Sequence, residues 1–162
     1  MTTLVIVESP AKCKKIESYL GNGYKCVASF GHIRGLDGLK SIDFNNNYNP
    51  TFTALKGKGK FISQLKKHIS KSSEIILATD DDREGEAIAW HICKMFKLPV
   101  TTTKRIIFHE ITKTAILNAV QNPTIINMDI VNAQLGRQVL DLIVGFTISP
   151  VLWKNIAFNK NN

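Results

Sequence analysis

Short, unbroken runs of apolar residues recur along the chain at positions 4–7 and 75–78, and a third run follows Arg105 up to position 108. Runs of four or so apolar and β-branched residues are typical of strands that are buried on both faces of a sheet. Positions 24–29 predict one more strand. Because strands of this kind belong to parallel sheets covered by helices, the pattern favours an α/β fold.

Segments with helical periodicity separate the predicted strands. Ser9 can cap a helix and Pro10 suits its first turn, so positions 11–20 are predicted to be helical up to the Gly-Asn-Gly sequence that follows. Positions 84–97 and 112–120 also predict helices, and positions 60–68 do so more weakly. The alternation predicts a mostly parallel, Rossmann-like sheet sandwiched by helices, with functional residues at the carboxyl ends of the strands.

The alternation is interrupted in the middle of the chain and gives way to helix at its end. Positions 30–59 are rich in Gly, Asp and Asn, which predicts a long loop or a small excursion from the sheet. Near the end of the chain, positions 129–143 predict a helix with sharply divided polar and apolar faces. Ser149 and Pro150 are expected to begin a separate short helix that reaches Trp153.

Two of the predicted strands end in carboxylates. The run at 75–78 leads to three consecutive acids, and alternation along an extended chain places Asp80 and Asp82 on one side and Asp81 on the other. Glu84 begins the next predicted helix and is a better third member than Glu86, which lies about 200° further round that helix. Glu8 follows the first strand and supplies a fourth carboxylate if the two strands are neighbours.

Carboxylates gathered this closely favour a bound divalent cation. Like charges repel and raise one another's pKa, and a cation removes that repulsion. Oxygen ligands without His or Cys indicate a hard cation, which predicts Mg²⁺, with Mn²⁺ as a substitute. The alternative is a solvated acidic turn at a helix amino terminus, where acids are favoured in any case. The placement at a strand end and the spacing favour the metal site.

The composition of the chain limits the classes of molecule that it is expected to bind. The 162 residues, 44% of them hydrophobic, suffice for one domain with a sizeable core, and a net charge of +8 favours a polyanion such as nucleic acid. The three cysteines form no CxxC pattern, which indicates neither a disulfide framework nor a zinc site. With no basic leader and no apolar run approaching a membrane span, we expect a cytoplasmic protein with no membrane partner.

Several motifs follow one another along the chain in a fixed order. They are ESPAK at 8–12, GHIR at 31–34, DDDREGEAIAWH at 80–91, EITK at 110–113, VNAQ at 131–134 and SPVLW at 149–153. Together they resemble bacterial-type type IA DNA topoisomerases over essentially the whole chain. A single DxDxE pattern would be a weak signal, whereas this ordered set is highly specific.

The resemblance implies a TOPRIM fold for positions 1–128, with helical positions 129–162 at the start of the DNA-binding gate domain. It implies that Asp80, Asp82 and Glu84 bind magnesium together with Glu8, and that Glu8 and Lys12 act on the scissile phosphate. Arg105 would hold a phosphate or one of the carboxylates, and a structural pairing is favoured. The residues implied to contact single-stranded DNA are His32, Arg34, Arg137, Gln138, Asp141, Leu142 and Lys154.

In that family, a tyrosine from a separate domain attacks DNA and forms a 5'-phosphotyrosine bond. Another strand passes through the gap before it is resealed, which relaxes negatively supercoiled DNA without ATP. The tyrosine lies beyond the region matched here, and Tyr19, Tyr24 and Tyr48 occur in other contexts. We therefore expect a monomeric, nucleoid-associated chain that binds magnesium and DNA but cleaves DNA only with the remaining domains of the same polypeptide.

The sequence leaves other functions open. One is a stand-alone DNA-binding or scaffold module that keeps its acids for folding, and another is a different phosphoryl-transfer enzyme such as a primase, nuclease or phosphatase. No Walker-type Gly-rich loop supports the second. Glu8 is either a proton donor and acceptor or only a metal ligand. Arg137 and Asp141, four residues apart, either face DNA or form an ordinary exposed ion pair.

Overall fold

The computed structural model describes residues 2–158, and its centre is a four-stranded sheet in which every neighbouring pair is parallel. The strand order is β2-β1-β7-β8, so that the first strand of the chain lies in the interior of the sheet. The predicted parallel α/β architecture is confirmed. The strands are β1 (Thr3–Val7), β2 (Tyr24–Ala28), β7 (Glu74–Ala78) and β8 (Lys104–Arg105).

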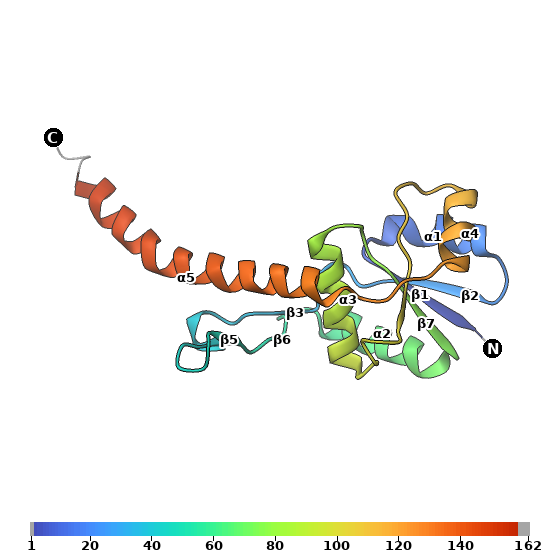
Figure 1. Cartoon of the computed structure of the whole chain (residues 1–162), viewed down its shortest axis with the longest axis horizontal. Coiled ribbons are helices and arrows are strands. Elements are labelled where there is room, and N and C mark those ends of the chain that lie inside the picture. The colour runs from blue at the N-terminus through green and yellow to red at the C-terminus, as the bar shows by residue number, and fades with distance from the viewer. Residues whose placement is uncertain (1, 159–162) are drawn as a thin grey trace.

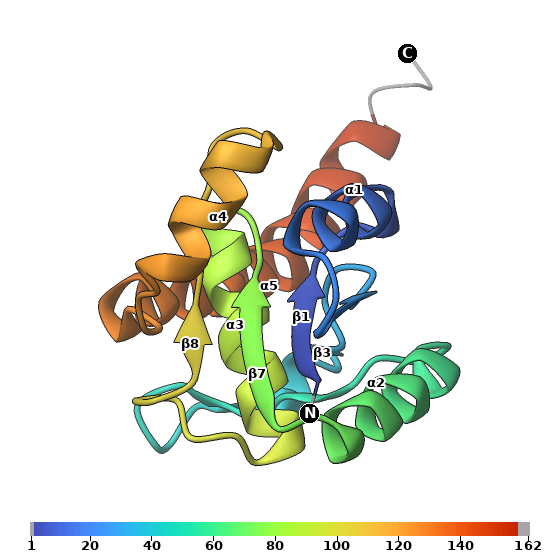
Figure 2. The same cartoon turned by 90° about the vertical axis from the view of Figure 1, so that its right-hand side faces the viewer.

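Helices cover both faces of the sheet, as Figures 1 and 2 show. One face is covered by α1 and α4, and the other by α2, α3 and the beginning of α5. The sandwich predicted from the alternation of strands and helices is therefore present. The helices are α1 (Pro10–Leu20), α2 (Gly59–Lys71), α3 (Arg83–Phe96), α4 (Lys113–Gln121) and α5 (Met128–Phe158).

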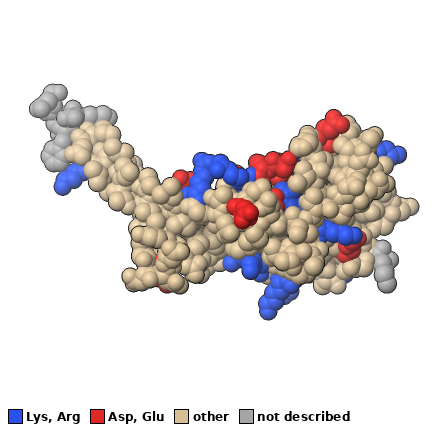
Figure 3. All heavy atoms as spheres, viewed as in Figure 1, with Lys and Arg blue, Asp and Glu red and all other residues tan. Residues whose placement is uncertain are grey.

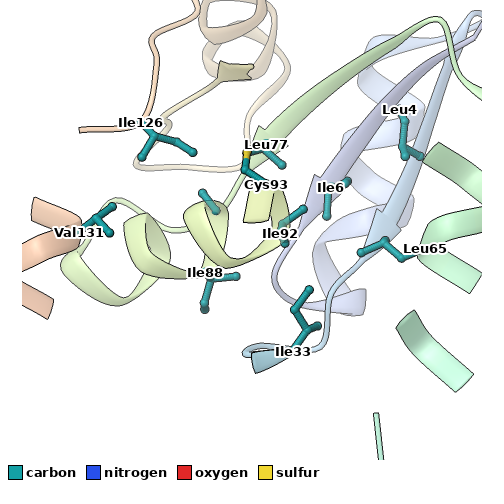
Figure 4. Close-up of a cluster of buried hydrophobic side chains, with 11 residues drawn as sticks. Leu4, Ile6, Ile33, Leu65, Leu77, Ile88, Ile92, Cys93, Ile126 and Val131 are labelled. Carbon is teal, nitrogen blue, oxygen red and sulfur yellow. The ribbon is translucent and has the colours of Figure 1, made fainter. Parts of the chain in front are cut away.

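Alternation along β1 divides the buried side chains into two cores. Leu4 and Ile6 face the core beneath α2 and α3, which Figure 4 shows, whereas Val5 and Val7 face the core beneath α1 and α4. All four side chains are fully buried, as expected of a strand covered on both faces. The three cysteines are free thiols.

Helix α1 begins and ends where its sequence predicts. The Ser9 hydroxyl accepts a hydrogen bond from the Ala11 amide, and Pro10 occupies the first turn. Gly21 ends the helix at a φ of 74°, a value that glycine adopts without strain, and its amide donates to the Glu17 carbonyl. These local signals orient α1 so that its amino terminus lies beside the carboxyl end of β1.

Strand β8 is shorter than predicted. The sequence indicated strand up to position 108, but only Lys104–Arg105 pair with β7 as a strand. The partner strand explains the difference, because β7 ends at Ala78 and turns into the acidic loop just beyond the position opposite Arg105. Ile106 makes one further hydrogen bond, to the Leu77 carbonyl, and stays buried without a strand partner beyond it.

The predicted excursion between β2 and α2 is confirmed and contains two small antiparallel pairs. In Figure 1 it lies along the base of α5. Its turns use residues at positive φ, among them Asn47 and Tyr48 in the Asn-rich stretch. Its elements are β3 (Arg34–Gly35) with β6 (Thr53–Ala54), the short 3-10 helix Leu39–Ser41, and β4 (Ile42–Asp43) with β5 (Asn49–Pro50).

The end of the described chain differs from the prediction. Instead of two helices with a break before Pro150, α5 is one helix of 31 residues with Pro150 inside it. The prediction of a break was wrong because a proline removes one hydrogen bond of the ladder, which here resumes in the residues beyond it. Figure 1 shows α5 projecting away from the α/β body.

The projecting part of α5 is largely apolar and exposed. Phe146, Leu152 and Trp153 are each more than half exposed, and Figure 3 shows this arm mostly free of charged side chains. By length and composition alone, residues Met128–Ile156 would be sufficient to cross a membrane, so the expectation that no run approaches a membrane span is wrong on that criterion. One such helix is weak evidence for a membrane span, and α5 carries a polar stripe that includes Arg137 and Asp141.

Gly85 allows the acidic loop to approach helix α3. A Cβ at this position would lie 2.1 Å from the carbonyl oxygen of Asp80, so we expect Gly85→Ala to lower the free energy of unfolding by about 1–3 kcal/mol. Gly136→Ala is the control, because its Cβ would meet nothing within 4 Å and alanine is favoured inside a helix by about 1 kcal/mol. Urea unfolding measures both variants, and an unchanged stability of Gly85→Ala would contradict the close approach.

Candidate metal and nucleic-acid site

The register of the central strands brings the acidic residues to one edge of the sheet. Val7 pairs with Ala78 in parallel register, so Glu8 and the loop that begins at Thr79 leave the sheet at the same end. Asp82 then caps α3, with its Oδ1 accepting a hydrogen bond of 2.6 Å from the Gly85 amide. The proximity of these acids, which depended in the sequence analysis on the two strands being neighbours, follows from this pairing.

Basic side chains engage two of the four carboxylates. Lys12, on the first turns of α1, forms an ion pair with Asp80. His32, in the loop after β2, places its Nε2 3.1 Å from Glu84 Oε1. Both pairs are partly exposed to solvent, with the Asp80 side chain 44% and the Glu84 side chain 58% exposed. Asp80 and Glu84 are therefore accessible to solvent, and each contacts a basic side chain.

The pKa of Glu8 reports the electrostatics of the cluster. Burial raises this pKa above its ordinary value, and the charges of Asp80, Asp82 and Glu84 raise it further. Lys12 acts in the opposite direction. Glu8 is thus within electrostatic reach of all three predicted metal ligands, and its carboxyl group is shifted in the direction that proton transfer near neutral pH requires.

Asp81 faces a different neighbour. Its carboxylate lies 3.6 Å from Nδ1 of His109, on the segment that follows β8. Asp81 therefore has its own partner outside the cluster, in keeping with the alternation expected of an extended chain end.

The donor set suits a hard cation, although its side chains are otherwise engaged. Glu8, Asp80, Asp82 and Glu84 offer only carboxylate oxygens, which Mg²⁺ prefers. Within residues 2–158, no three His, Cys, Asp or Glu side chains stand together as a ready-made metal site. Asp80, Glu84 and Asp82 instead contact Lys12, His32 and the Gly85 amide, respectively.

A groove next to the acidic cluster collects most of the residues implied to contact DNA. Its volume is 490 Å³, and it lies between the excursion and α5. His32 connects the groove with the acidic cluster, since it lines the groove and contacts Glu84. Figure 3 shows basic and acidic side chains close together near the base of α5. The lining residues are His32, Arg34, Gly35, Leu36, Leu55, Gln138, Asp141 and Leu142.

Two of the residues implied to contact DNA do not line the groove, and the side chain of a third, Arg34, is held by contacts within the protein. Arg137 is exposed beside the groove, with its Nε 3.5 Å from Asp141 Oδ2, and Lys154 is exposed much further along α5. Arg34 is half-buried and donates from Nη2 to the Phe52 carbonyl at 3.0 Å. Its guanidinium also lies 5.8 Å from the centre of the Trp90 ring. The protein itself therefore fixes the orientation of Arg34.

A buried ion pair lies beneath the acidic loop, and the sequence did not identify which two residues form it. Arg105 is fully buried, and its Nη2 lies 2.8 Å from Oε2 of Glu86, which is 4% exposed. The same nitrogen donates to the Asp80 carbonyl at 3.0 Å. Arg105 thus holds a carboxylate, the alternative favoured from the sequence. Helical spacing set Glu86 apart from the metal ligands but gave no signal that identified Arg105 as its partner.

Comparisons with known proteins agree with this arrangement. Residues 3–111 match the family model of the Toprim domain, and the chain therefore belongs to the Toprim domain family. The chain is also similar to full-length topoisomerase I from Thermotoga maritima, with 47% identical residues over 93% of this chain and a TM-score of 0.86. It spans 26% of that relative's length. The resemblance inferred from the motifs and the TOPRIM fold it implied are confirmed.

The raised pKa of Glu8 predicts opposite effects of two substitutions. Asp80→Asn removes a negative charge and frees Lys12, so we expect the pKa of Glu8 to fall. Lys12→Met removes the positive charge that lowers this pKa, so we expect the pKa of Glu8 to rise. A side-chain carboxyl NMR titration of Glu8 in each variant measures the shifts. An unchanged midpoint in both variants would show that Glu8 does not sense the cluster.

The buried pair predicts a large contrast with an exposed pair on the same sheet. Glu86→Ala leaves the charge of Arg105 buried and unpaired, which we expect to cost about 3–5 kcal/mol of stability. Glu74 pairs with Lys104 at 2.6 Å, but both side chains are 40% exposed or more, so Glu74→Ala is expected to cost at most about 1 kcal/mol. Urea unfolding compares the two, and similar losses would contradict this assignment.

Proposed function

We propose that this chain is the magnesium-binding portion of a type IA DNA topoisomerase, which relaxes negatively supercoiled DNA through a transient 5'-phosphotyrosine bond. The observation that carries the proposal is the convergence of four carboxylates and Lys12 at one end of the sheet, next to a groove lined by His32 and the polar face of α5. The similarity to topoisomerase I of Thermotoga maritima supports it.

Asp80, Asp82 and Glu84 would hold the cation, with Glu8 adjacent. Bound Mg²⁺ would neutralise charge on the phosphate and on the acids. The release of Asp80 from Lys12 would leave the lysine ammonium free to contact a phosphate oxygen. Lys12 lies near the amino terminus of α1, whose helix dipole also favours an anion.

Glu8 would move the proton of the leaving or attacking sugar oxygen. Its raised pKa leaves more of the carboxyl group protonated near neutral pH than in an ordinary glutamate, so more of it can donate a proton. Lys12 limits this shift while it stays near Glu8, and a bound cation would limit it in the same way. The positions of Lys12 and of the cation would therefore both affect proton donation by Glu8.

DNA is the partner that the groove and the charge favour. The net charge of +8 attracts a polyanion, while the polar groups of His32, Gln138 and Asp141 line the groove next to the acids. A single strand that follows the groove would bring a phosphate to Lys12 and Glu8. We propose Mg²⁺, or Mn²⁺ in its place, as the cofactor and single-stranded DNA as the ligand of this portion.

None of the tyrosines of the chain serves as the nucleophile in this proposal. Tyr19 and Tyr24 pack against the core beneath α1 and α4, and Tyr48 lies in the excursion beside Phe44. The chain would therefore bind DNA without cutting it, and the other domains of the polypeptide would supply the attacking tyrosine.

A chimeric enzyme tests the proposal. We would replace the matching segment of Thermotoga maritima topoisomerase I by this chain and assay relaxation of negatively supercoiled DNA with Mg²⁺. We expect the chimera to relax DNA and the Asp80→Asn, Asp82→Asn double variant to lose at least about 100-fold of the rate, the order of effect of removing one charge-stabilising group.

Asp81→Asn is the matched control for that assay. It removes one carboxylate of the same motif, but Asp81 faces His109 outside the cluster, so the relaxation rate should stay within about threefold of the unsubstituted chimera. Equal activity of all three chimeras would overturn the metal site. A folded, DNA-binding chimera without relaxation would favour the scaffold function instead.

A further inference from the structure

The buried Arg105 side chain connects two parts of the molecule that the proposed function uses separately. Its Nη2 donates at 3.0 Å to the Asp80 carbonyl, in the acidic loop, and lies 2.8 Å from Glu86 Oε2. The other oxygen of that carboxylate, Glu86 Oε1, accepts a hydrogen bond of 2.6 Å from the Asn127 amide. Three interactions thus join the acidic loop to the residue that precedes α5.

Asn127 fixes the beginning of α5. Its side-chain oxygen accepts hydrogen bonds from the amides of Asp129 at 3.0 Å and Ile130 at 3.4 Å, which cap the helix. Helix α5 carries Gln138, Asp141 and Leu142 into the groove. A displacement of the Asn127 amide therefore changes the position of the helix that lines one side of the groove.

The interior around this connection is closely packed. Arg105 is fully buried, and the Asp80 carbonyl lies so close to Gly85 that a Cβ there would come within 2.1 Å of the carbonyl oxygen. Nε and Nη1 of Arg105 have no partner within residues 2–158, so the guanidinium has donors with which to take up a second arrangement. A shift of the Asp80 peptide must therefore be followed by the guanidinium and by Glu86, because a broken hydrogen bond here leaves buried charge unsatisfied.

We propose that Arg105 and Glu86 are positioning residues that couple cation binding at the acidic loop to the placement of α5 beside the DNA groove. The inference rests on the proposed function, since it takes Asp80 as a cation ligand. If Asp80 left Lys12 to hold a cation, its peptide, whose carbonyl accepts from Arg105, would shift with the side chain. The movement reaches Asn127 through Arg105 and Glu86 and thereby changes the groove that receives single-stranded DNA.

Magnesium titration of the ¹⁵N-labelled chain tests this coupling without any catalytic assay. In the wild-type chain, we expect amide shifts at Asp80, Asp82 and Glu84 and also at Asn127 and the first residues of α5. In Arg105→Lys, the shifts at the acidic loop should persist and those at Asn127 should be lost. A lysine keeps the charge, but its side chain is one bond shorter, so its nitrogen falls short of the position from which Nη2 of arginine reaches both the Asp80 carbonyl and Glu86.

The Arg105→Lys variant is expected to fold, because the backbone of residue 105 keeps its two hydrogen bonds to Thr124, at 2.8 and 2.7 Å. Glu74→Gln is the matched control, because it weakens an exposed ion pair to the neighbouring Lys104 and should leave all the shifts as in the wild type. Binding of a fluorescent oligo(dT) provides a second reading, since coupling is reciprocal: Mg²⁺ should change its affinity in the wild type and not in Arg105→Lys.

The outcomes separate the inference from the proposed function. Wild-type shifts confined to the acidic loop, or Asn127 shifts that survive in folded Arg105→Lys, overturn the coupling and leave the metal site standing. An absence of shifts at Asp80, Asp82 and Glu84 overturns the metal site and the coupling together. If Arg105→Lys fails to fold, the coupling is tested in the wild type alone. Amide shifts at Asn127 and a change of oligo(dT) affinity with Mg²⁺ support it, and the absence of both overturns it.

Discussion

The parallel pairing of β1 with β7 is the constraint on which the site depends. The two strands share one register and end together at Val7 and Ala78, so the residues that follow them emerge at one edge of the sheet. Both strands are buried under helices on both faces, and close packing against these helices disfavours a shift of one strand past the other. Glu8 and Asp80 meet for this reason, although they are far apart in the sequence.

The folded chain resolves the repulsion of its clustered carboxylates with internal partners. Lys12 neutralises Asp80, His32 contacts Glu84, and Asp82 accepts from a backbone amide at the start of α3. These partners are also the groups that a cation or a phosphate would displace or recruit. In the function proposed above, binding of Mg²⁺ would therefore be an exchange of ion pairs at a preformed loop, and it would release Lys12 where a phosphate would lie. Arg105 supports the loop from below without entering that exchange.

Much of this architecture could be predicted from the sequence, because its signals are local. The cap at Ser9, the unbroken apolar strands and the acids at a strand end each depend on neighbouring residues alone. The interruption expected before Pro150 was wrong, since one missing hydrogen bond does not end a long helix. The pairing of Glu86 with Arg105 and the groove between the excursion and α5 are long-range contacts, which periodicity does not encode. His32 was identified as a candidate DNA contact only through the family resemblance of the motifs.

Crystals of the chain soaked in Mn²⁺ would show whether the acids bind a cation, because anomalous scattering locates the ion without reference to the protein atoms. We expect a peak within ligand distance of carboxylate oxygens from Asp80, Asp82 and Glu84, with the Lys12 ammonium moved away from Asp80. A peak at another site, or an Asp80–Lys12 pair that persists at saturating Mn²⁺ with no peak beside it, would rule out this metal site and identify the acids as an ordinary cap of helix α3.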